Sequence, residues 1–335
     1  MATYGGRNEP GTLVHVNGSA TSGRPSVIRL GLWVEDFAPV PGGGGLLARA
    51  AAVAEAAERA GFDSLFVSEA PGSPKRVLPT DAGGSPFPRG DDFEVYSLLG
   101  ALASRSRSLH LGAVPSGAER RAPAVLAKIV TTVDVISHGR GVLALGWEAE
   151  PGGQEADRLG ERLQVCRAVL EDETPRFAGR FYHVDGAVNR PGPVQRGGVP
   201  IVVFAGPGAP VRPGLLRVAG HFADAVVVEG DAASVAEAVA LVGEAAASMR
   251  RAPGSVQVVW KGRPDRPADE VSARLLAGAD GCIVSLADAD RSDADRPEAI
   301  ARLGSVLRDA VDAVDAVPAG PGTRQPWRAP SDDRH

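Results

Sequence analysis

Residues Ala122–Trp147 read APAVLAKIVTTVDVISHGRGVLALGW and contain one complete helix, turn and strand. Apolar residues recur at three- and four-residue spacing over Val125–Ile136, which predicts an amphipathic helix with Pro123 in its first turn. His138-Gly139 ends this helix, because glycine readily adopts the left-handed conformation found at helix termini. The continuous apolar run Val142–Leu145 then predicts a short strand that is buried on both faces. A helix, a tight turn and a buried strand form one unit of a parallel α/β protein.

The same alternation extends through the chain and predicts a (β/α)8 TIM barrel. The predicted strands are Ile28–Val34, Asp63–Val67, Leu109–Val114, Val142–Leu145, Ile201–Phe204, Ala225–Val228, Val256–Trp260 and Cys282–Leu286. The other predicted helices are Leu46–Ala60, Phe93–Ser104, Gln154–Leu170, Leu215–His221, Val235–Met249, Ala268–Leu276 and Ile300–Val317. Turn-rich Phe177–Gly198 is an insertion after the fourth barrel helix. A doubly wound sheet is disfavoured, because the first strand-to-helix turn lacks a GxGxxG sequence.

Composition indicates one large domain and excludes several classes of partner. Of the 335 residues, 44% are hydrophobic, and we expect a barrel over residues 27–317 between disordered polar tails at 1–26 and 318–335. The net charge of −5 argues against nucleic-acid and anionic-membrane partners. Cys166 and Cys282 are far apart, which excludes a disulfide framework and is typical of a reducing compartment. With no membrane span or signal peptide visible, we expect a cytoplasmic protein.

The active site of such a barrel lies at the carboxyl ends of its strands. Three of the four tryptophans, Trp33, Trp147 and Trp260, fall at predicted strand ends. They suggest a pocket for a flat conjugated ligand, although tryptophans that simply plug the barrel would give the same pattern. The remaining strand-end residues that we single out are Glu35, Asp36, Ser68, Glu69, Pro115, Ser116, Gly146, Glu148, Gly206, Gly208, Glu229, Lys261 and Ser285.

Two features of these ends suggest chemistry. Glycines in the turn Ala205-Gly206-Pro207-Gly208 would let backbone N–H groups approach a phosphate, with Arg212 nearby, although a plain strand-to-helix turn explains them equally. Glu69 and Glu148 are candidate general acids or bases if they are partly desolvated, and otherwise are solvated rim charges. The histidines lack a second ligand at metal-binding spacing, so we expect no metal site.

Five segments in order resemble the bacterial luciferase-like family of flavin- or deazaflavin-dependent oxidoreductases, over roughly residues 29–286. They are AERAGFDSLFVSE (Ala57–Glu69), FEVYSLLGALASRSRSLHLGA (Phe93–Ala113), the opening APAVLAKIVTTVDVISHGR, FAGRFYHVDGAVNRPGPVQRGGVPIVV (Phe177–Val203) and LLRVAGHFADAVVV (Leu215–Val228). Within this family the chain looks most like the branch that uses the deazaflavin coenzyme F420.

The resemblance implies a cofactor, F420 or reduced FMN, whose ring lies over the strand ends. It implies a non-proline cis peptide near Ala113-Val114-Pro115, against which the ring packs, and a cofactor phosphate at the Gly206–Gly208 turn. The cofactor-binding residues would then be Trp33, Ser68, Ala113, Val114, Ser116, Gly146, Trp147, Ala205, Gly206 and Gly208. The catalytic candidates are Glu69 and Glu148. The resemblance also implies a small-molecule substrate and a possible homodimer.

The sequence departs from the family pattern at two strand ends. Relatives usually carry a histidine after the acid that follows strand two, whereas here Ala70 follows Glu69. The run Ala144-Leu145-Gly146-Trp147 has fewer glycines than the usual G-x-G-x-G-W. The first hypothesis is an active oxidoreductase or monooxygenase acting on an unknown small organic substrate. The alternative is a catalytically silent family member that serves as a binding or partner subunit, and an unrelated barrel enzyme is the third possibility.

Overall fold

The computed structural model describes residues 28–34, 45–68, 94–115, 121–146, 154–195, 197–206, 212–262, 266–285 and 296–316, with Leu46 and Arg296 as backbone only. Both predicted tails lie outside these ranges. None of the helices within them combines the length and the hydropathy needed to cross a membrane.

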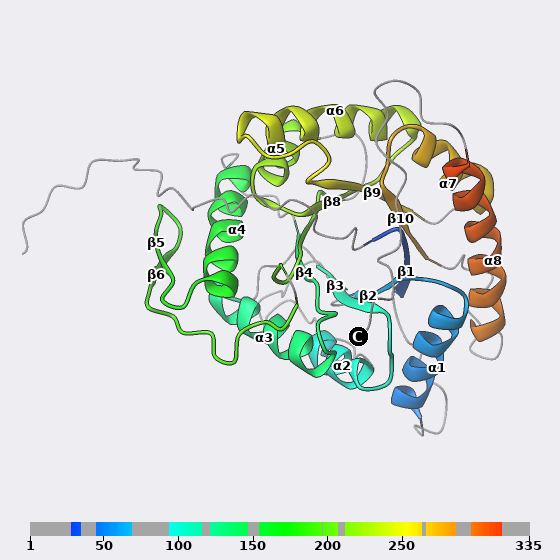
Figure 1. Ribbon diagram of the computed structural model, residues 1–335, viewed down its shortest axis with the longest axis horizontal. Coiled ribbons are helices and arrows are strands. Elements are labelled where there is room, and N and C mark those ends of the chain that lie inside the picture. Colours follow the sequence, from blue (N-terminus) through cyan, green and yellow to red (C-terminus); the bar gives the residue numbers. More distant parts are fainter. Residues whose placement is uncertain are drawn as a thin grey trace, which may run out of the picture.

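A ring of parallel strands lies at the centre and a ring of helices surrounds it (Figure 1). The described strands of the ring are β1 (Leu30–Val34), β2 (Ser64–Ser68), β3 (His110–Val114), β4 (Leu143–Gly146), β7 (Ile201–Phe204), β8 (Ala225–Val228), β9 (Gln257–Gly262) and β10 (Gly281–Ser285). The helices are α1 (Leu46–Arg59), α2 (Val95–Ala103), α3 (Pro123–Ile136), α4 (Glu155–Glu171), α5 (Pro213–Phe222), α6 (Ala232–Ser248), α7 (Pro267–Leu276) and α8 (Arg296–Asp315). The predicted (β/α)8 barrel is confirmed, and the largest shift of an element end is at α8, which begins at Arg296 instead of Ile300.

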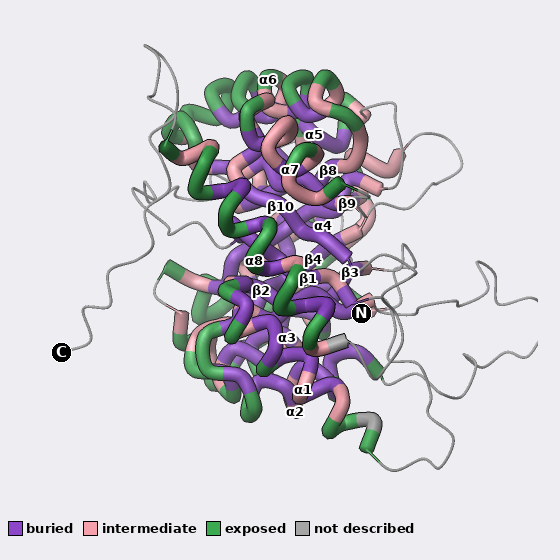
Figure 2. Tube along the Cα trace, turned by 90° about the vertical axis from the view of Figure 1, so that its right-hand side faces the viewer, coloured by how far each residue is buried: buried purple, intermediate pink, exposed green. Residues whose placement is uncertain are grey.

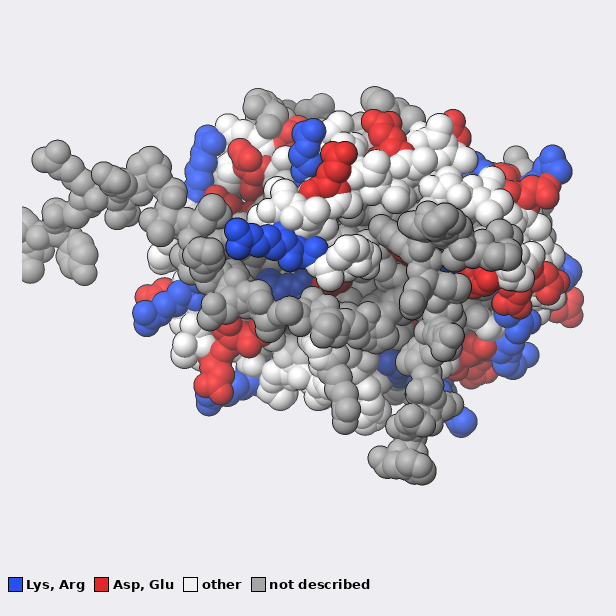
Figure 3. All heavy atoms as spheres, turned by 45° about the horizontal axis from the view of Figure 1, so that its top comes forward, with Lys and Arg blue, Asp and Glu red and all other residues white. Residues whose placement is uncertain are grey.

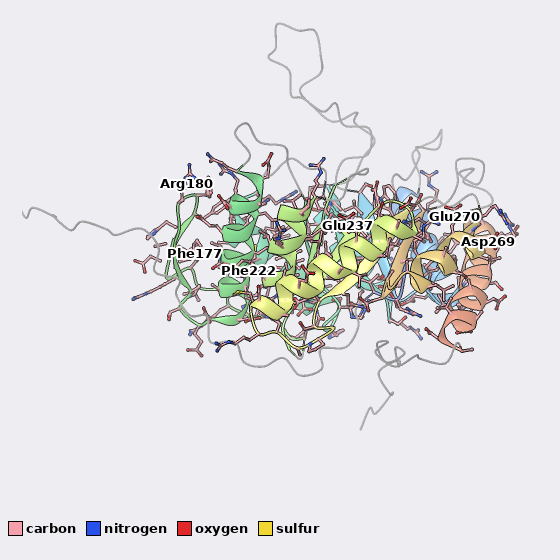
Figure 4. All side chains as sticks on the ribbon, turned by 90° about the horizontal axis from the view of Figure 1, so that it is seen from above. Phe177, Arg180, Phe222, Glu237, Asp269 and Glu270 are labelled. Atoms are coloured by element: carbon pink, nitrogen blue, oxygen red, sulfur yellow. The ribbon has the colours of Figure 1, made fainter. Side chains whose placement is uncertain are left out.

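The predicted insertion after α4 contains a small hairpin outside the helix ring. Its antiparallel strands are β5 (Arg176–Ala178) and β6 (His183–Asp185). The carboxylate of Glu161 on α4 accepts the backbone N–H groups of residues 180, 181 and 182, at 2.7–3.0 Å, and so holds the hairpin turn against the barrel. Figure 4 shows Phe177 and Arg180 of the hairpin beside α4, at the end of the molecule opposite Asp269 and Glu270 of α7.

The barrel closes between β3 and β4. The hydrogen-bonded order is β3-β2-β1-β10-β9-β8-β7-β4, and a parallel bridge between Leu111 and Gly141 joins its two ends. The N–H of Leu111 donates to the carbonyl of Arg140 at 2.8 Å, and the N–H of Val142 donates to the carbonyl of Leu111 at 2.9 Å. The opening stretch of the sequence analysis therefore supplies one side of the seam.

Arg140 reinforces this seam. Its guanidinium donates to the carbonyls of residues 103, 106 and 109 and to the hydroxyl of Ser106, at 2.7–3.0 Å. Its Nε donates to the carbonyl of Ser137 at 2.8 Å. A planar fork with five donors can satisfy this many acceptors at once, and its charge suits the carbonyl-rich ends of α2 and α3. His138 and Gly139 before it have φ angles of 57° and 91°, as the predicted helix end requires.

The amino ends of three strands are closed by aspartates. Asp63, Asp224 and Asp280 precede β2, β8 and β10, and each accepts a backbone N–H from the neighbouring strand, or from the residue just before it, at 2.7–2.8 Å. Without the aspartates, the backbone N–H groups at the amino ends of these strands would be buried without a hydrogen-bond partner. These bonds make this end of the barrel a structural floor.

Alternate strand residues divide the core into two layers. In Figure 2 the strands are drawn mainly in the colour of buried residues, whereas the outer side of α6 is drawn as exposed. One layer lies between strands and helices and contains residues of both. The other consists of strand residues and the adjoining Ile28 and Val142, and fills the barrel interior. Phe66 crosses this interior to meet Phe204, with ring centroids 5.8 Å apart. Gly112 makes room for Phe66, because a Cβ at residue 112 would lie 2.6 Å from the phenylalanine ring.

Candidate active site

The carboxyl ends of the strands form the mouth of the barrel. Side chains two residues apart on a strand share a face. The residue two positions after the last interior-layer residue of a strand therefore points into this mouth. Interior residues Phe66, Ala144, Phe204, Val227, Val259 and Ile283 thereby identify Ser68, Gly146, Gly206, Glu229, Lys261 and Ser285 as mouth positions. Trp33 packs directly on the interior layer, and Val114 belongs to it.

One half of the mouth carries a connected polar network. The indole Nε1 of Trp33 on β1 donates to Oγ of Ser68 on β2, at 2.8 Å. The Nζ atom of Lys261 on β9 lies 3.9 Å from the centre of the Trp33 ring. The same Nζ donates to Oε1 of Glu229, which follows β8, at 2.6 Å. The network therefore connects β8, β9, β1 and β2, and it includes a half-buried aromatic ring.

The register of the strands explains how Lys261 reaches Trp33. Lys261 pairs with Ile283 of β10, whereas Trp33 pairs with Ser285 on the other side of that strand. The long side chain of Lys261 therefore passes over β10 to reach β1. Burying an ammonium group in a barrel is costly unless it is paired, and Glu229 supplies the counter-charge.

The other half of the mouth is lined by small and apolar residues. Val114 ends β3, Gly146 ends β4, and Gly206 follows β7 with a φ of 89°. Gly146 pairs with Phe204, so an aromatic side chain of the interior layer also lies beneath this half of the mouth. The structure thus brings together five of the predicted cofactor-binding residues in the mouth: Trp33, Ser68, Val114, Gly146 and Gly206. Whether they bind a cofactor stays a prediction.

Two predicted cofactor-binding residues present their side chains elsewhere. Ala113 and Ala205 belong to the layer between strands and helices, so only their backbone faces the mouth region. Glu69, Ser116, Trp147, Glu148 and Gly208 lie outside the described residues. The prediction that Glu69 and Glu148 are catalytic therefore stays a prediction.

Trp260 corrects the expectation that it lies on the rim with Trp33. Its side chain is 4% exposed and packs in the layer between strands and helices. Its Nε1 donates to the carbonyl of Gly230 at 3.0 Å, and the guanidinium of Arg274 lies over its ring. The reason is alternation, since Trp260 and Lys261 are adjacent and must face opposite ways. The pairing of Lys261 with Glu229 was not predicted, and counting alternate residues from the strand interior would have pointed to it.

The expected cis bond near the end of β3 is also corrected. In the described part of the chain the cis bond is Arg190–Pro191, and the bonds Ala113–Val114 and Val114–Pro115 are trans. The β3 ladder continues in register to Val114, which pairs with Ser68. An uninterrupted extended strand supplies no local force to offset the about 3–4 kcal/mol that a non-proline cis bond costs.

The turn after β7 retains part of the predicted phosphate site. Gly206 has the positive φ that favours glycine, and α5 begins soon after, at Pro213, with Arg212 as its first flanking residue. A helix N-terminus is compatible with an anion because its N–H groups are unpaired. The residues between 206 and 212 lie outside the described ranges, so phosphate binding here stays a prediction.

The strongest pKa shifts occur away from the mouth. Burial raises the pKa of Asp63 to about 6, against the opposing effect of its hydrogen bonds from Leu30 and Arg29. Burial likewise raises the pKa of the Cys166 and Cys282 thiols to about 12, and both are free cysteines. These groups lie at strand starts or in the helix layer. Perturbed pKa values often mark active sites, but here they report burial in the structural part of the barrel.

Lys/Arg and Asp/Glu side chains are interspersed on the face drawn in Figure 3. Among the residues that the structure describes, no group of three or more His, Cys, Asp or Glu could hold a metal ion.

Known proteins resemble the chain in both sequence and fold. The family model described as luciferase-like monooxygenase matches residues 28–308. A 5,10-methylenetetrahydromethanopterin reductase of Archaeoglobus fulgidus is 26% identical over 147 residues, which are 40% of this chain and 40% of that protein. A phthiodiolone/phenolphthiodiolone dimycocerosates ketoreductase of Mycobacterium kansasii is 30% identical over 198 residues, 53% of this chain and 52% of that protein. The chain thus spans about half or less of these curated relatives.

Solved structures share the fold at low sequence identity. The coenzyme F420 dependent tetrahydromethanopterin reductase of Methanopyrus kandleri superposes with a TM-score of 0.64 at 15% identity, covering 85% of this chain and 99% of that chain. A monooxygenase of Streptomyces bottropensis gives a TM-score of 0.53 at 18% identity, covering 86% and 82%. The family match spans most of the barrel that carries the mouth described above. The chain therefore belongs to the luciferase-like monooxygenase family.

Proposed function

We propose that the chain is an oxidoreductase that binds coenzyme F420, or FMN in its place, and acts on a small organic substrate. The proposal rests on family membership and on one structural observation, the division of the mouth into a polar half and a half of small apolar residues. Two curated relatives that match part of the chain are named as reductases, which favours hydride transfer over oxygen chemistry.

The apolar half fits a flat ring. Its inward-facing residues at the ends of β3 and β4 are Val114, Ala144 and Gly146, so among the residues described there none has a side chain larger than valine. Glycine at residue 206 lets the backbone approach a ligand closely, because it carries no Cβ. A planar heterocycle could therefore lie against β3 and β4, with its phosphate-bearing tail directed towards the turn after β7.

The chain's own residues would orient this ring and keep water away from it. Phe66 and Phe204 close the barrel beneath the mouth, so water cannot approach from below. Trp33 is fixed by Ser68 and forms an aromatic wall in the polar half of the mouth. When bound, the cofactor supplies the hydride or oxygen chemistry, which the protein side chains described here cannot supply themselves.

The test is titration of the purified chain with F420 and, separately, with FMN. We expect F420 to bind and to quench tryptophan fluorescence, because Trp33 lies in the mouth. Trp33→Phe should reduce this quenching. Trp260→Phe is the matched control, since Trp260 lies in the layer between strands and helices and its loss should leave the quenching by F420 in place.

Several results would contradict the proposal. The absence of binding by F420, FMN and their reduced forms would exclude a flavin-type cofactor. Binding of FMN with none of F420 would contradict F420 as the cofactor and leave FMN in its place. Quenching that Trp260→Phe removes and Trp33→Phe preserves would place the ligand outside the mouth.

A further inference from the structure

Lys261 is a cation built into the wall of the mouth. It is 9% exposed, and in the described part of the chain its Nζ donates to Glu229 at 2.6 Å and lies 3.9 Å from the centre of the Trp33 ring. An ammonium group has three N–H donors, and this hydrogen bond uses one of them. The aromatic face takes up the positive charge on one side without accepting a conventional hydrogen bond.

The partners of Lys261 are themselves held in place. Gly230, the residue after Glu229, accepts hydrogen bonds through its carbonyl from Trp260 Nε1 at 3.0 Å and from Arg274 Nε at 3.4 Å. Both donors reach it from the layer between strands and helices. On the other side, Ser68 fixes the indole of Trp33. Because the two ends of the network are anchored, the donors of Lys261 are preorganised for a ligand.

The charge balance at Lys261 selects the kind of ligand. The carboxylate of Glu229 neutralises the ammonium charge and would repel a second anion at short range. The pair nevertheless presents strong N–H donors beside an aromatic wall. Such a site favours a neutral oxygen acceptor attached to a flat apolar group over a carboxylate or a phosphate.

We propose that Lys261 binds the carbonyl oxygen of a neutral, flat ligand, such as an aromatic ketone, which packs against Trp33. This proposal rests on the proposed function, because it names the substrate class of the same mouth. A carbonyl oxygen is also present on the cofactor ring, and the experiment below separates these two sources.

The test uses 4-fluoroacetophenone and 4-fluorobenzoate, which have nearly the same shape and differ in charge. Their dissociation constants for the full chain are measured by ¹⁹F NMR, with and without F420. Wild type should bind the ketone about 10-fold more tightly than the carboxylate, because the Glu229 carboxylate repels only the charged probe. Lys261→Met should weaken binding of the ketone about 10-fold, because the N–H donor to its carbonyl oxygen is lost. Glu229→Gln should reverse the preference in favour of the carboxylate, because the ammonium charge is then unpaired.

The reversal in Glu229→Gln is a gain of binding, which misfolding cannot produce. The proposal is overturned if wild type binds both probes equally, if Lys261→Met binds the ketone as tightly as wild type does, or if Glu229→Gln leaves the preference for the ketone unchanged. If Lys261→Met binds F420 as tightly as wild type does, the carbonyl that Lys261 binds belongs to the substrate. If Lys261→Met binds F420 more weakly, and F420 competes with the ketone for wild type, the carbonyl belongs to the cofactor ring and the assignment to the substrate is overturned. Failure of F420 and FMN to bind wild type refutes the proposed function separately, since the probes are also measured without cofactor.

Discussion

Gly112→Ala is expected to destabilise the barrel by crowding Phe66. A Cβ at residue 112 would lie 2.6 Å from Cε1 and 2.9 Å from Cδ1 of that ring. Carbon atoms pack best at about 3.5–4.0 Å, so the ring must retreat by roughly 1 Å. It has little room to do so, because it is fully buried and meets Phe204 across the barrel.

The size of the effect follows from two opposing contributions. Overpacking of a core costs about 1–3 kcal/mol, whereas replacing glycine by alanine stabilises a protein by about 0.4–1 kcal/mol through the unfolded chain. We therefore expect a net loss of about 1–2 kcal/mol in the free energy of unfolding. The measurement is urea denaturation followed by far-UV circular dichroism, with the slope of the transition checked for constancy.

The matched control is Gly243→Ala on α6, where an added Cβ meets nothing within 4 Å. The same chemical change there should stabilise the helix by about 0.5–1 kcal/mol. In a Phe66→Leu background, Gly112→Ala should cost no more than about 0.5 kcal/mol, because the crowded ring is gone. If Gly112→Ala is neutral alone, or costs the same with and without the ring, the proposed packing of the interior is incorrect.

Two further substitutions test the seam and the floor of the barrel. Arg140→Lys should lower the free energy of unfolding by about 2–3 kcal/mol in the same urea assay, because a lysine cannot replace the several carbonyl contacts of the guanidinium. Exposed Arg59→Lys on α1 is the control, with a change expected within about 0.5 kcal/mol. Asp63→Asn should remove a pH dependence of stability. Because the folded-state pKa of Asp63, about 6, exceeds its ordinary value of 3.8, the folded protein binds this proton more tightly than the unfolded chain does. Its contribution to stability is therefore greatest below pH 3.8 and is lost as the pH rises through about 6. Relative to Asp63→Asn, wild type should lose on the order of 3 kcal/mol across that interval, measured by urea denaturation at each pH.

Two results would contradict these expectations. Equal denaturation midpoints for Arg140→Lys and Arg59→Lys would mean that the arginine fork does not stabilise the seam. A difference between wild type and Asp63→Asn that stays constant between acidic and neutral pH would mean that the buried carboxyl titrates normally.

The order of strands and helices could be predicted from the chain alone, because each depends on short-range patterns. The 3.6-residue period over Val125–Ile136 and the glycine after His138 determine where α3 lies and ends. Short apolar runs such as Ile201–Phe204 identify strands that are buried on both faces. Regular alternation of the two then leaves the barrel as the favoured closed arrangement.

The composition of the mouth could not be predicted in the same way. Trp260 and Lys261 are neighbours in sequence, yet one packs against helices and the other faces the barrel interior. Which residue faces inward depends on the register of each strand with its neighbours, and this register is set by contacts between distant segments. The position of Lys261 between Glu229 and Trp33 arises only when β8, β9, β10 and β1 lie side by side. The amino-acid sequence by itself therefore determined the barrel and the strand ends, whereas only the tertiary structure decided which side chains meet there.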